Sequence, residues 1–136
     1  MNILFFIITK DKTHYVLSSF SLRQTIEKME SCGYTSLPII NEKGEYIATI
    51  TEGDILRYIK RNNNLTLKNS EKVNILSLPI KKEVRSIKVY SNIEDLIDIA
   101  LDQNFVPIVD DSNIFIGIIT RKAIINYFAK NHNLKE

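Results

Sequence analysis

The sequence contains few of the residues that cross-link a protein or give it a strong charge. Its 136 residues include one cysteine, Cys32, which excludes an internal disulfide and any zinc site that needs several cysteines. Eighteen basic side chains stand against sixteen acidic ones, for a net charge of +2, so no electrostatic footprint for nucleic acid is present. With 44% hydrophobic and 25% charged residues, the composition instead predicts a folded domain with its own core.

The chain also lacks a hydrophobic run long enough to span a bilayer. The run Met1–Ile8 is too short, and it has neither a basic leader nor a small-residue cleavage site after it. We expect this segment to cover another surface, such as that of a partner subunit. The expected protein is cytoplasmic and does not contact a membrane.

Motifs for catalysis and for metal binding are missing as well. The sequence has no glycine-rich phosphate loop, no nucleophile elbow and no cluster of histidine, cysteine and glutamate. His14 and His132 are its two histidines, too few to anchor a metal site. The sequence therefore favours a protein that is not an enzyme, binds no metal and requires no cofactor.

The sequence does contain an internal repeat at a spacing of 69 residues. Segment 37–51 aligns with segment 106–120, and both copies run thirteen residues from a proline to a threonine. Across 38–58, seven of twenty-one positions are identical to those 69 residues later. Two copies are too few for a solenoid. They predict an α+β fold made of two similar half-domains that are related by a pseudo-two-fold axis.

Each copy predicts the order strand, helix, strand, strand, helix. In the first copy Ser21 and Gln24 form a capping-box pattern, and Gly33 ends the helix that follows. Thr51 caps the second helix, whose buried stripe is expected to carry Ile55, Leu56 and Ile59. In the first copy we expect strands over 14–17, 37–40 and 46–50 and a helix over 22–32. In the second copy we expect strands over 84–89, 105–109 and 115–119, a first helix that begins at Ser91 or Asn92, and a last helix over 121–130.

These elements suggest three parts within one compact module. Residues 1–60 hold the N-terminal element and the first copy, and residues 83–136 hold the second copy. Residues 61–82 connect them, because the asparagine-rich stretch from 61 onward is polar and aperiodic.

The motif Gly33-Tyr34-Thr35-Ser36-Leu37-Pro38, followed by a hairpin and by Thr51-Glu52-Gly53-Asp54, resembles one half of a tandem pair of CBS domains, the Bateman module. The second copy at Pro107 and Thr120 extends the resemblance to nearly the whole chain. It implies a regulatory module that binds AMP, ADP, ATP or a related adenosine nucleotide in clefts between the copies. It also implies a homodimer, and we expect the regulated effector to be a separate protein.

The resemblance implies a set of ligand contacts. Residues 12–14 close the pocket, residues 34–38 form the adenine wall, and Asp54 receives the ribose hydroxyls. Thr51 opens a helix, where free N–H groups and the helix dipole favour a phosphate, although Thr-x-x-Asp is also an ordinary capping arrangement. The expected ligand-binding residues are Lys12, Thr13, His14, Tyr34, Thr35, Ser36, Leu37, Pro38, Thr51, Asp54, Phe105, Val106, Pro107, Thr120, Arg121 and Lys122.

The second copy departs from this pattern, since Ala123 stands where the first copy has Asp54. Arg121 and Lys122 place two cations at the start of a helix, which favours an anion such as a phosphate nearby. We therefore expect one site that binds the ribose through a carboxylate. The second site is expected either to bind no ligand or to bind one mainly through its phosphate. The chain is also similar to small CBS pairs of Gram-positive bacteria that bind cyclic di-AMP. A cyclic di-AMP receptor and a ligand-free dimerisation scaffold are the two alternatives to a mononucleotide sensor.

Overall fold

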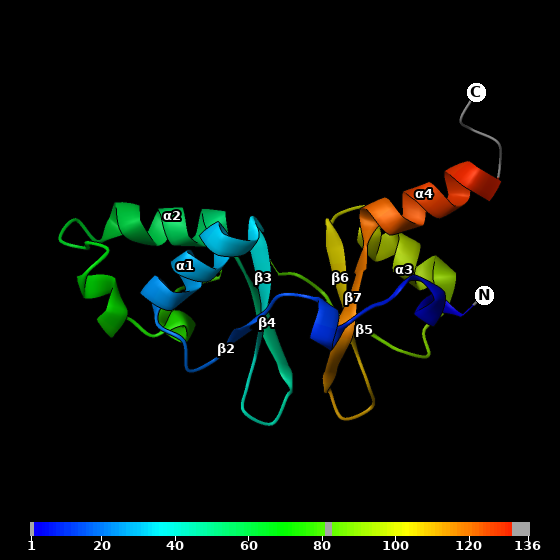
Figure 1. Cartoon of the computed structure of the whole chain (residues 1–136), viewed down its shortest axis with the longest axis horizontal. Coiled ribbons are helices and arrows are strands. Elements are labelled where there is room, and N and C mark those ends of the chain that lie inside the picture. The colour runs from blue at the N-terminus through cyan, green and yellow to red at the C-terminus, as the bar shows by residue number, and fades with distance from the viewer. Residues whose placement is uncertain (1, 81–82, 132–136) are drawn as a thin grey trace. The chain divides into compact units, whose positions relative to one another are not determined.

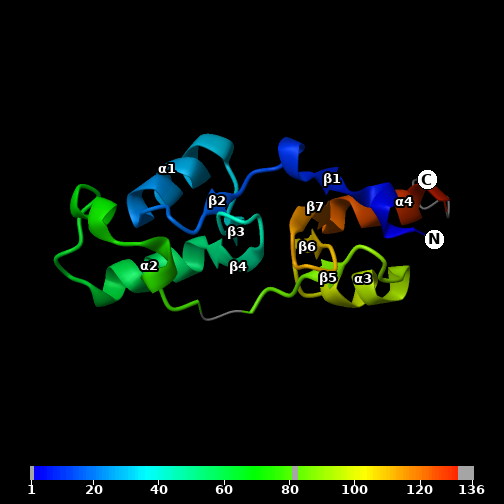
Figure 2. The same cartoon turned by 90° about the horizontal axis from the view of Figure 1, so that it is seen from below.

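The protein consists of two compact units, each with one small sheet. The computed structural model describes residues 2–80 and 83–131, and its units are residues 14–83 and residues 1–13 together with 84–136. In each unit two helices cover the same face of the sheet (Figures 1 and 2). The predicted α+β class and the order of elements in each repeat are confirmed. No helix in the described ranges has the length and apolar character needed to cross a membrane.

The unit of the first repeat has the sheet order β2-β3-β4. Strand β2 runs parallel to β3, and β3 is antiparallel to β4. Ser21 and Gln24 form the predicted capping box, and Gly33 ends the first helix with a φ of 73°. The elements are β2 (Val16–Leu17), α1 (Leu22–Cys32), β3 (Ser36–Ile40), β4 (Tyr46–Thr51) and α2 (Glu52–Arg61).

The second part of the connecting segment belongs to this unit. Ile75 and Leu78 are buried in the same core cluster as Leu22 of α1 and Ile39 of β3. The backbone N–H of Leu22 donates to the carbonyl of Val73 over 2.7 Å. Two short 3₁₀ turns, η3 (Asn69–Lys72) and η4 (Ile75–Ser77), shape the segment. It therefore extends the core of the first repeat as well as joining the repeats.

The unit of the second repeat has the sheet order β1-β7-β6-β5. Strand β5 runs parallel to β6, and β6 is antiparallel to β7. Asn92 caps its first helix by accepting from the N–H of Asp95 over 2.9 Å. The elements that follow residue 83 are β5 (Ile87–Lys88), α3 (Ile93–Ala100), β6 (Phe105–Val109), β7 (Phe115–Thr120) and α4 (Arg121–Asn131).

The N-terminal segment belongs to the second repeat and not to the first. Strand β1 (Ile8–Thr9) pairs antiparallel with β7, and Ile3 and Phe6 are buried in the core of that unit. Two 3₁₀ turns flank the strand, η1 (Ile3–Phe6) and η2 (Lys10–Lys12). This differs from the sequence-based division, which grouped residues 1–60. The hydrophobic segment does cover another surface, as expected, and that surface lies within its own chain.

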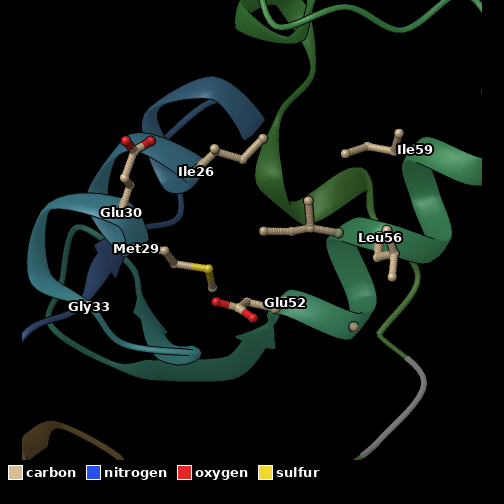
Figure 3. A pocket seen from close by; sticks show the side chains of 9 residues that line it. Ile26, Met29, Glu30, Gly33, Glu52, Leu56 and Ile59 are labelled. Atoms are coloured by element: carbon tan, nitrogen blue, oxygen red, sulfur yellow. The ribbon is translucent and has the colours of Figure 1, made fainter.

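The expected buried stripe of α2 is wrong in part. Ile55 is buried, but the side chains of Leu56 and Ile59 are 68% and 40% exposed. Together with Ile26 and Met29 of α1 they line a groove of about 650 Å³ between the two helices (Figure 3). Helical periodicity places Ile55, Leu56 and Ile59 close together on the helix surface, but it does not fix the width of the buried face.

Candidate functional site

The start of α2 carries the clearest cluster of expected site residues. The Thr51 hydroxyl accepts from the N–H of Asp54 over 3.1 Å, and the Asp54 carboxylate accepts from the N–H of Thr51 over 3.0 Å. The second carboxylate oxygen accepts from the Arg57 guanidinium over 2.6 Å. Asp54 is 1% exposed. In this structure the carboxylate thus caps α2 and pairs with Arg57, which is the structural alternative to ribose binding that the Thr-x-x-Asp pattern left open.

The loop between α1 and β3 lies beside this helix start. Ser36 is the register partner of Thr51, and the N–H of Glu52 donates to the carbonyl of Thr35 over 2.9 Å. Leu37 is fully buried in the core cluster of the unit, and Pro38 is buried too. The fold therefore brings Thr35, Ser36 and Thr51 together. It directs the Leu37 side chain into the core, so a ligand could meet this strand only through its backbone.

The residues ahead of β2 include a paired and an unpaired polar group. The rings of His14 and Tyr34 meet edge to face with their centroids 5.0 Å apart, which joins two expected site residues. Thr13 is 8% exposed, and its hydroxyl is buried with no hydrogen-bond partner among the described residues. Lys12 is exposed at the end of η2. Burying a hydroxyl without a partner costs about 1–3 kcal/mol, so Thr13 stands out as a polar group that lacks its complement.

The second repeat has the same backbone arrangement with different side chains. Phe105 is the register partner of Thr120, and the N–H of Arg121 donates to the carbonyl of Asn104 over 2.9 Å. The Thr120 hydroxyl accepts from the N–H of Ala123 over 3.1 Å. Val106 lies fully buried in the core cluster, Pro107 is also buried, and Phe105 is half-buried. The side chains of Val106 and Pro107 thus lie in the interior, as those of Leu37 and Pro38 do in the first repeat.

The two cations at the start of α4 are placed differently. The Arg121 guanidinium turns back to the end of α3, where it donates to the carbonyls of Ala100 over 2.7 Å and Leu101 over 3.5 Å. A cation at a helix C-terminus is favoured by the dipole and by the unpaired carbonyls. Lys122 is exposed. Arg121 thus has a structural partner within its own repeat, which sequence reasoning missed because the contact joins residues twenty positions apart.

Two further residues near these positions were not expected. Arg57 is the ion-pair partner of Asp54, and its spacing of three residues on one helix was a usable signal. Gln103 is 7% exposed and makes three hydrogen bonds to backbone atoms of Arg85 and Phe105. The repeat could have drawn attention to Gln103, because it stands at the position that Tyr34 has in the first copy.

The pKa values of Tyr46 and Asp11 depart from their ordinary values. Burial raises the pKa of Tyr46, whose hydroxyl pairs with that of Thr49 over 2.8 Å. The Thr9 hydroxyl lowers the pKa of Asp11, next to Lys12. Among the residues that the structure describes, no group of three or more histidine, cysteine or acidic side chains could hold a metal ion.

Comparison with known proteins identifies the repeat. The family model described as "CBS domain" matches twice, at residues 7–61 and 76–130. The chain belongs to the CBS-domain family. An uncharacterised protein of Methanopyrus kandleri is 32% identical over 101 residues, which are 72% of this chain and 48% of that protein, so the chain spans about half the length of this curated relative.

Solved structures of CBS proteins share the fold. The structure described as CbpB in complex with c-di-AMP has a TM-score of 0.87 at 21% identity, covering 98% of this chain and 89% of that one. The Listeria monocytogenes CbpB protein in complex with c-di-AMP has a TM-score of 0.82 at 21% identity, covering 95% and 96%. CBSX2 in complex with AMP has a TM-score of 0.76 at 19% identity, covering 96% and 98%.

Proposed function

We propose that this tandem CBS protein is a sensor that binds an adenosine nucleotide through its first repeat and modulates a separate effector protein. The observation that carries the proposal is the meeting of expected site residues within this repeat, where the His14 ring packs on Tyr34 and the carbonyl of Thr35 accepts from the N–H of Glu52 at the start of α2. Directly ahead of His14, the buried hydroxyl of Thr13 has no partner among the described residues, and a ligand that pairs with it would remove this cost in free energy. Two structural neighbours are described as complexes with c-di-AMP and one as a complex with AMP, which supports an adenine ligand.

In the proposed mechanism each part of the nucleotide meets one group of residues. The adenine lies against the backbone of residues 34–38 and pairs with the backbone N–H and carbonyl of His14. The phosphate lies at the start of α2, where Thr51 stands at a helix N-terminus. The ribose hydroxyls donate to the Asp54 carboxylate, which can accept about four hydrogen bonds in all. Binding alters the effector only as far as the nucleotide prefers one conformation of the module over another.

A cyclic dinucleotide is the alternative ligand, and the basic start of α4 is the feature that favours it. Lys122 is exposed there, so it is available to a second phosphate, while Arg121 would have to leave the carbonyls at the end of α3. A ligand-free scaffold is the third reading. Both carboxylate oxygens of Asp54 already accept hydrogen bonds, which favours that reading, since the capping box needs no ligand.

We further propose that the protein is a homodimer that pairs the groove between α1 and α2 with α4 of a second copy. The groove exposes Leu56 and Ile59 and is flanked by Glu30 and Glu52 (Figure 3). At the position of the second repeat that corresponds to Leu56, helix α4 exposes Ile125, and Lys122 precedes it by three residues. An acidic apolar groove and a basic apolar helix are complementary in charge, which favours this head-to-tail pairing over a groove that faces its own copy.

The test is a calorimetric titration of the full chain after bound ligand has been stripped. The ligands are AMP, ADP, ATP and cyclic di-AMP, with GMP and cyclic di-GMP as controls for the base. We expect binding of adenine ligands alone, and the tightest of them identifies the physiological class. Scattering and pull-downs with and without that ligand then measure the change of conformation and of effector binding. If none of the adenine ligands binds, the sensor proposal fails and the scaffold reading replaces it.

A further inference from the structure

The side chain of Gln103 is held in a reciprocal pair with one backbone residue. Its Oε1 accepts from the N–H of Arg85 over 2.7 Å, and its Nε2 donates to the carbonyl of Arg85 over 3.0 Å. The same Nε2 donates to the carbonyl of Phe105 over 3.1 Å. Both amide hydrogens and the carbonyl are thus engaged, and the side chain is buried at 7% exposure.

The first repeat has a different residue at this place. In the two sheets Val16 pairs with Ile39 as Ile87 pairs with Ile108, so the register equates His14 with Arg85. Tyr34 and Gln103 each lie five residues before the equivalent isoleucine. Tyr34 has no carboxamide to offer the His14 backbone, and its ring lies edge-on to the His14 imidazole instead. The repeats therefore differ at the position where the proposed ligand would place its base.

A carboxamide and an adenine base present the same hydrogen-bonding pattern. The amide sets a carbonyl acceptor beside an NH₂ donor. Adenine sets a ring nitrogen acceptor beside its exocyclic NH₂ donor. A backbone residue that offers one N–H and one carbonyl to an outside group can pair reciprocally with either. In the second repeat the backbone of Arg85 has this partner already, supplied by the chain itself.

We infer that Gln103 occupies, in the second repeat, the place that an adenine base takes in the first, so that the module accepts one adenine at its first repeat and excludes it from its second. The inference rests on the proposed function for the identity of the base. Two features would then keep the second repeat from binding a nucleotide. The Gln103 side chain takes the place of the base, and Ala123 replaces the aspartate that receives the ribose hydroxyls. Removing the amide frees the N–H and the carbonyl of Arg85 to pair with the base of an outside ligand.

The experiment counts binding sites on the stripped full chain by calorimetry with adenosine. We expect about one adenosine per chain for the wild type and about two for Gln103→Ala. Purine riboside, which lacks the exocyclic amino donor, is expected to add no second site. Saturating adenosine should also raise the melting temperature of Gln103→Ala above that of the unliganded variant by roughly 5 to 10 °C at a hundredfold excess over the dissociation constant.

Gln24→Ala is the matched control. The side-chain oxygen of Gln24 also accepts from a backbone N–H, that of Ser21, but within the capping box of α1. Its loss should lower stability without adding a site. If Gln103→Ala does not fold, Gln103→Tyr carries the residue of the first repeat at this position and is scored in the same way.

The outcomes separate this inference from the proposed function. A wild type that binds one adenosine, with variants that also bind one, overturns the inference and leaves the proposed function standing. A wild type that binds two overturns the inference as well. If the wild type binds none, the proposed function fails, and the variants still decide the inference by binding one adenosine or none. In the wild type, hydrogen exchange at the Arg85 amide should stay unchanged at saturation, and a change there would show that the ligand displaces Gln103.

Discussion

The hydroxyl of Thr13 is buried and has no hydrogen-bond partner among the residues that the structure describes. The side chain sits between the exposed Lys12 and the half-buried His14, on the stretch that leads into β2. Sequence reasoning could select this stretch from the family resemblance, but not the state of the hydroxyl. Whether a threonine is paired depends on atoms far away in the sequence, which periodicity and spacing do not report.

The isosteric variant Thr13→Val should separate the unliganded from the liganded protein. It removes a buried polar group that has no partner, so unliganded stability should rise by about 1–2 kcal/mol in thermal or urea unfolding. The affinity for the nucleotide should fall about five- to tenfold in calorimetry, because one hydrogen bond to the ligand is lost.

Thr25→Val is the matched control, since the fully buried hydroxyl of Thr25 donates to the carbonyl of Ser21 over 3.0 Å. That variant should lose stability and keep its affinity. Unchanged affinity of Thr13→Val would remove Thr13 from the binding site.

Asp54→Asn tests whether the buried carboxylate serves the ligand or the helix alone. The amide oxygen can still accept from the N–H of Thr51, but the charged pair with Arg57 is lost, which should lower stability by about 1–2 kcal/mol. Ribose hydroxyls bind a carboxylate more strongly than an amide, so the affinity for AMP should fall about tenfold or more. Glu52→Gln, an exposed acid in the same helical turn, is expected to change neither. Loss of stability with full affinity would assign Asp54 to the capping box only.

At the scale of elements, local signals predicted more than long-range ones. The helix over 22–32 has the predicted bounds, because Ser21, Gln24 and Gly33 act within one turn of its ends. The strand over 105–109 also has its predicted bounds. The first strands of the repeats are shorter than predicted, at 16–17 and 87–88, because their pairing with β3 and β6 covers only two residues. The pairing of β1 with β7 was not predictable, since a two-residue strand has no period to detect.

Gly117→Ala should detach β1 from the second repeat. A Cβ atom at residue 117 would lie far inside contact distance of the carbonyl oxygen of Ile8, so the backbone of β1 would have to move. We expect a loss of about 2–3 kcal/mol and faster hydrogen exchange over residues 7–10, measured by unfolding and by mass spectrometry.

Gly53→Ala is the control for this substitution. The nearest atom to its Cβ belongs to the flexible Arg57 guanidinium, at 3.2 Å, and the residue lies inside α2. An alanine there should raise stability by about 0.5–1 kcal/mol, because glycine is the poorer helix former. Slow exchange over residues 7–10 in Gly117→Ala would mean that β1 can shift along β7 and keep its pairing.

At the scale of the whole molecule, the two repeats share the same backbone arrangement but differ in the side chains at their helix starts. Both sheets have the same core register, and both helix starts are capped by a threonine, Thr51 or Thr120. The side chains around them differ in charge, with Glu52 and Asp54 on one helix start and Arg121 and Lys122 on the other. A chain whose two helix starts differ in the sign of their charge can associate with a second copy in the reversed direction, which is the basis of the proposed dimer.

The dimer prediction concerns both the oligomeric state and its direction. Sedimentation velocity at micromolar concentration should show a dimer for the wild type and a monomer for Leu56→Glu, which puts a charge into the apolar groove next to Glu52. Leu67→Glu, at a residue that is exposed in the connecting segment, should leave the dimer intact. A wild-type monomer under these conditions would end the proposal.

Direction is read from disulfide formation in a Cys32→Ser background, so that no native thiol competes. Chains that carry Leu56→Cys are mixed with chains that carry Ile125→Cys, and each is also oxidised alone. Head-to-tail pairing brings the two different cysteines of neighbouring copies together, so the mixture should link and the separate samples should not. Linking of Leu56→Cys alone would mean that the groove faces its own copy, where Glu30 and Glu52 of both chains would meet and the dimer should strengthen with salt.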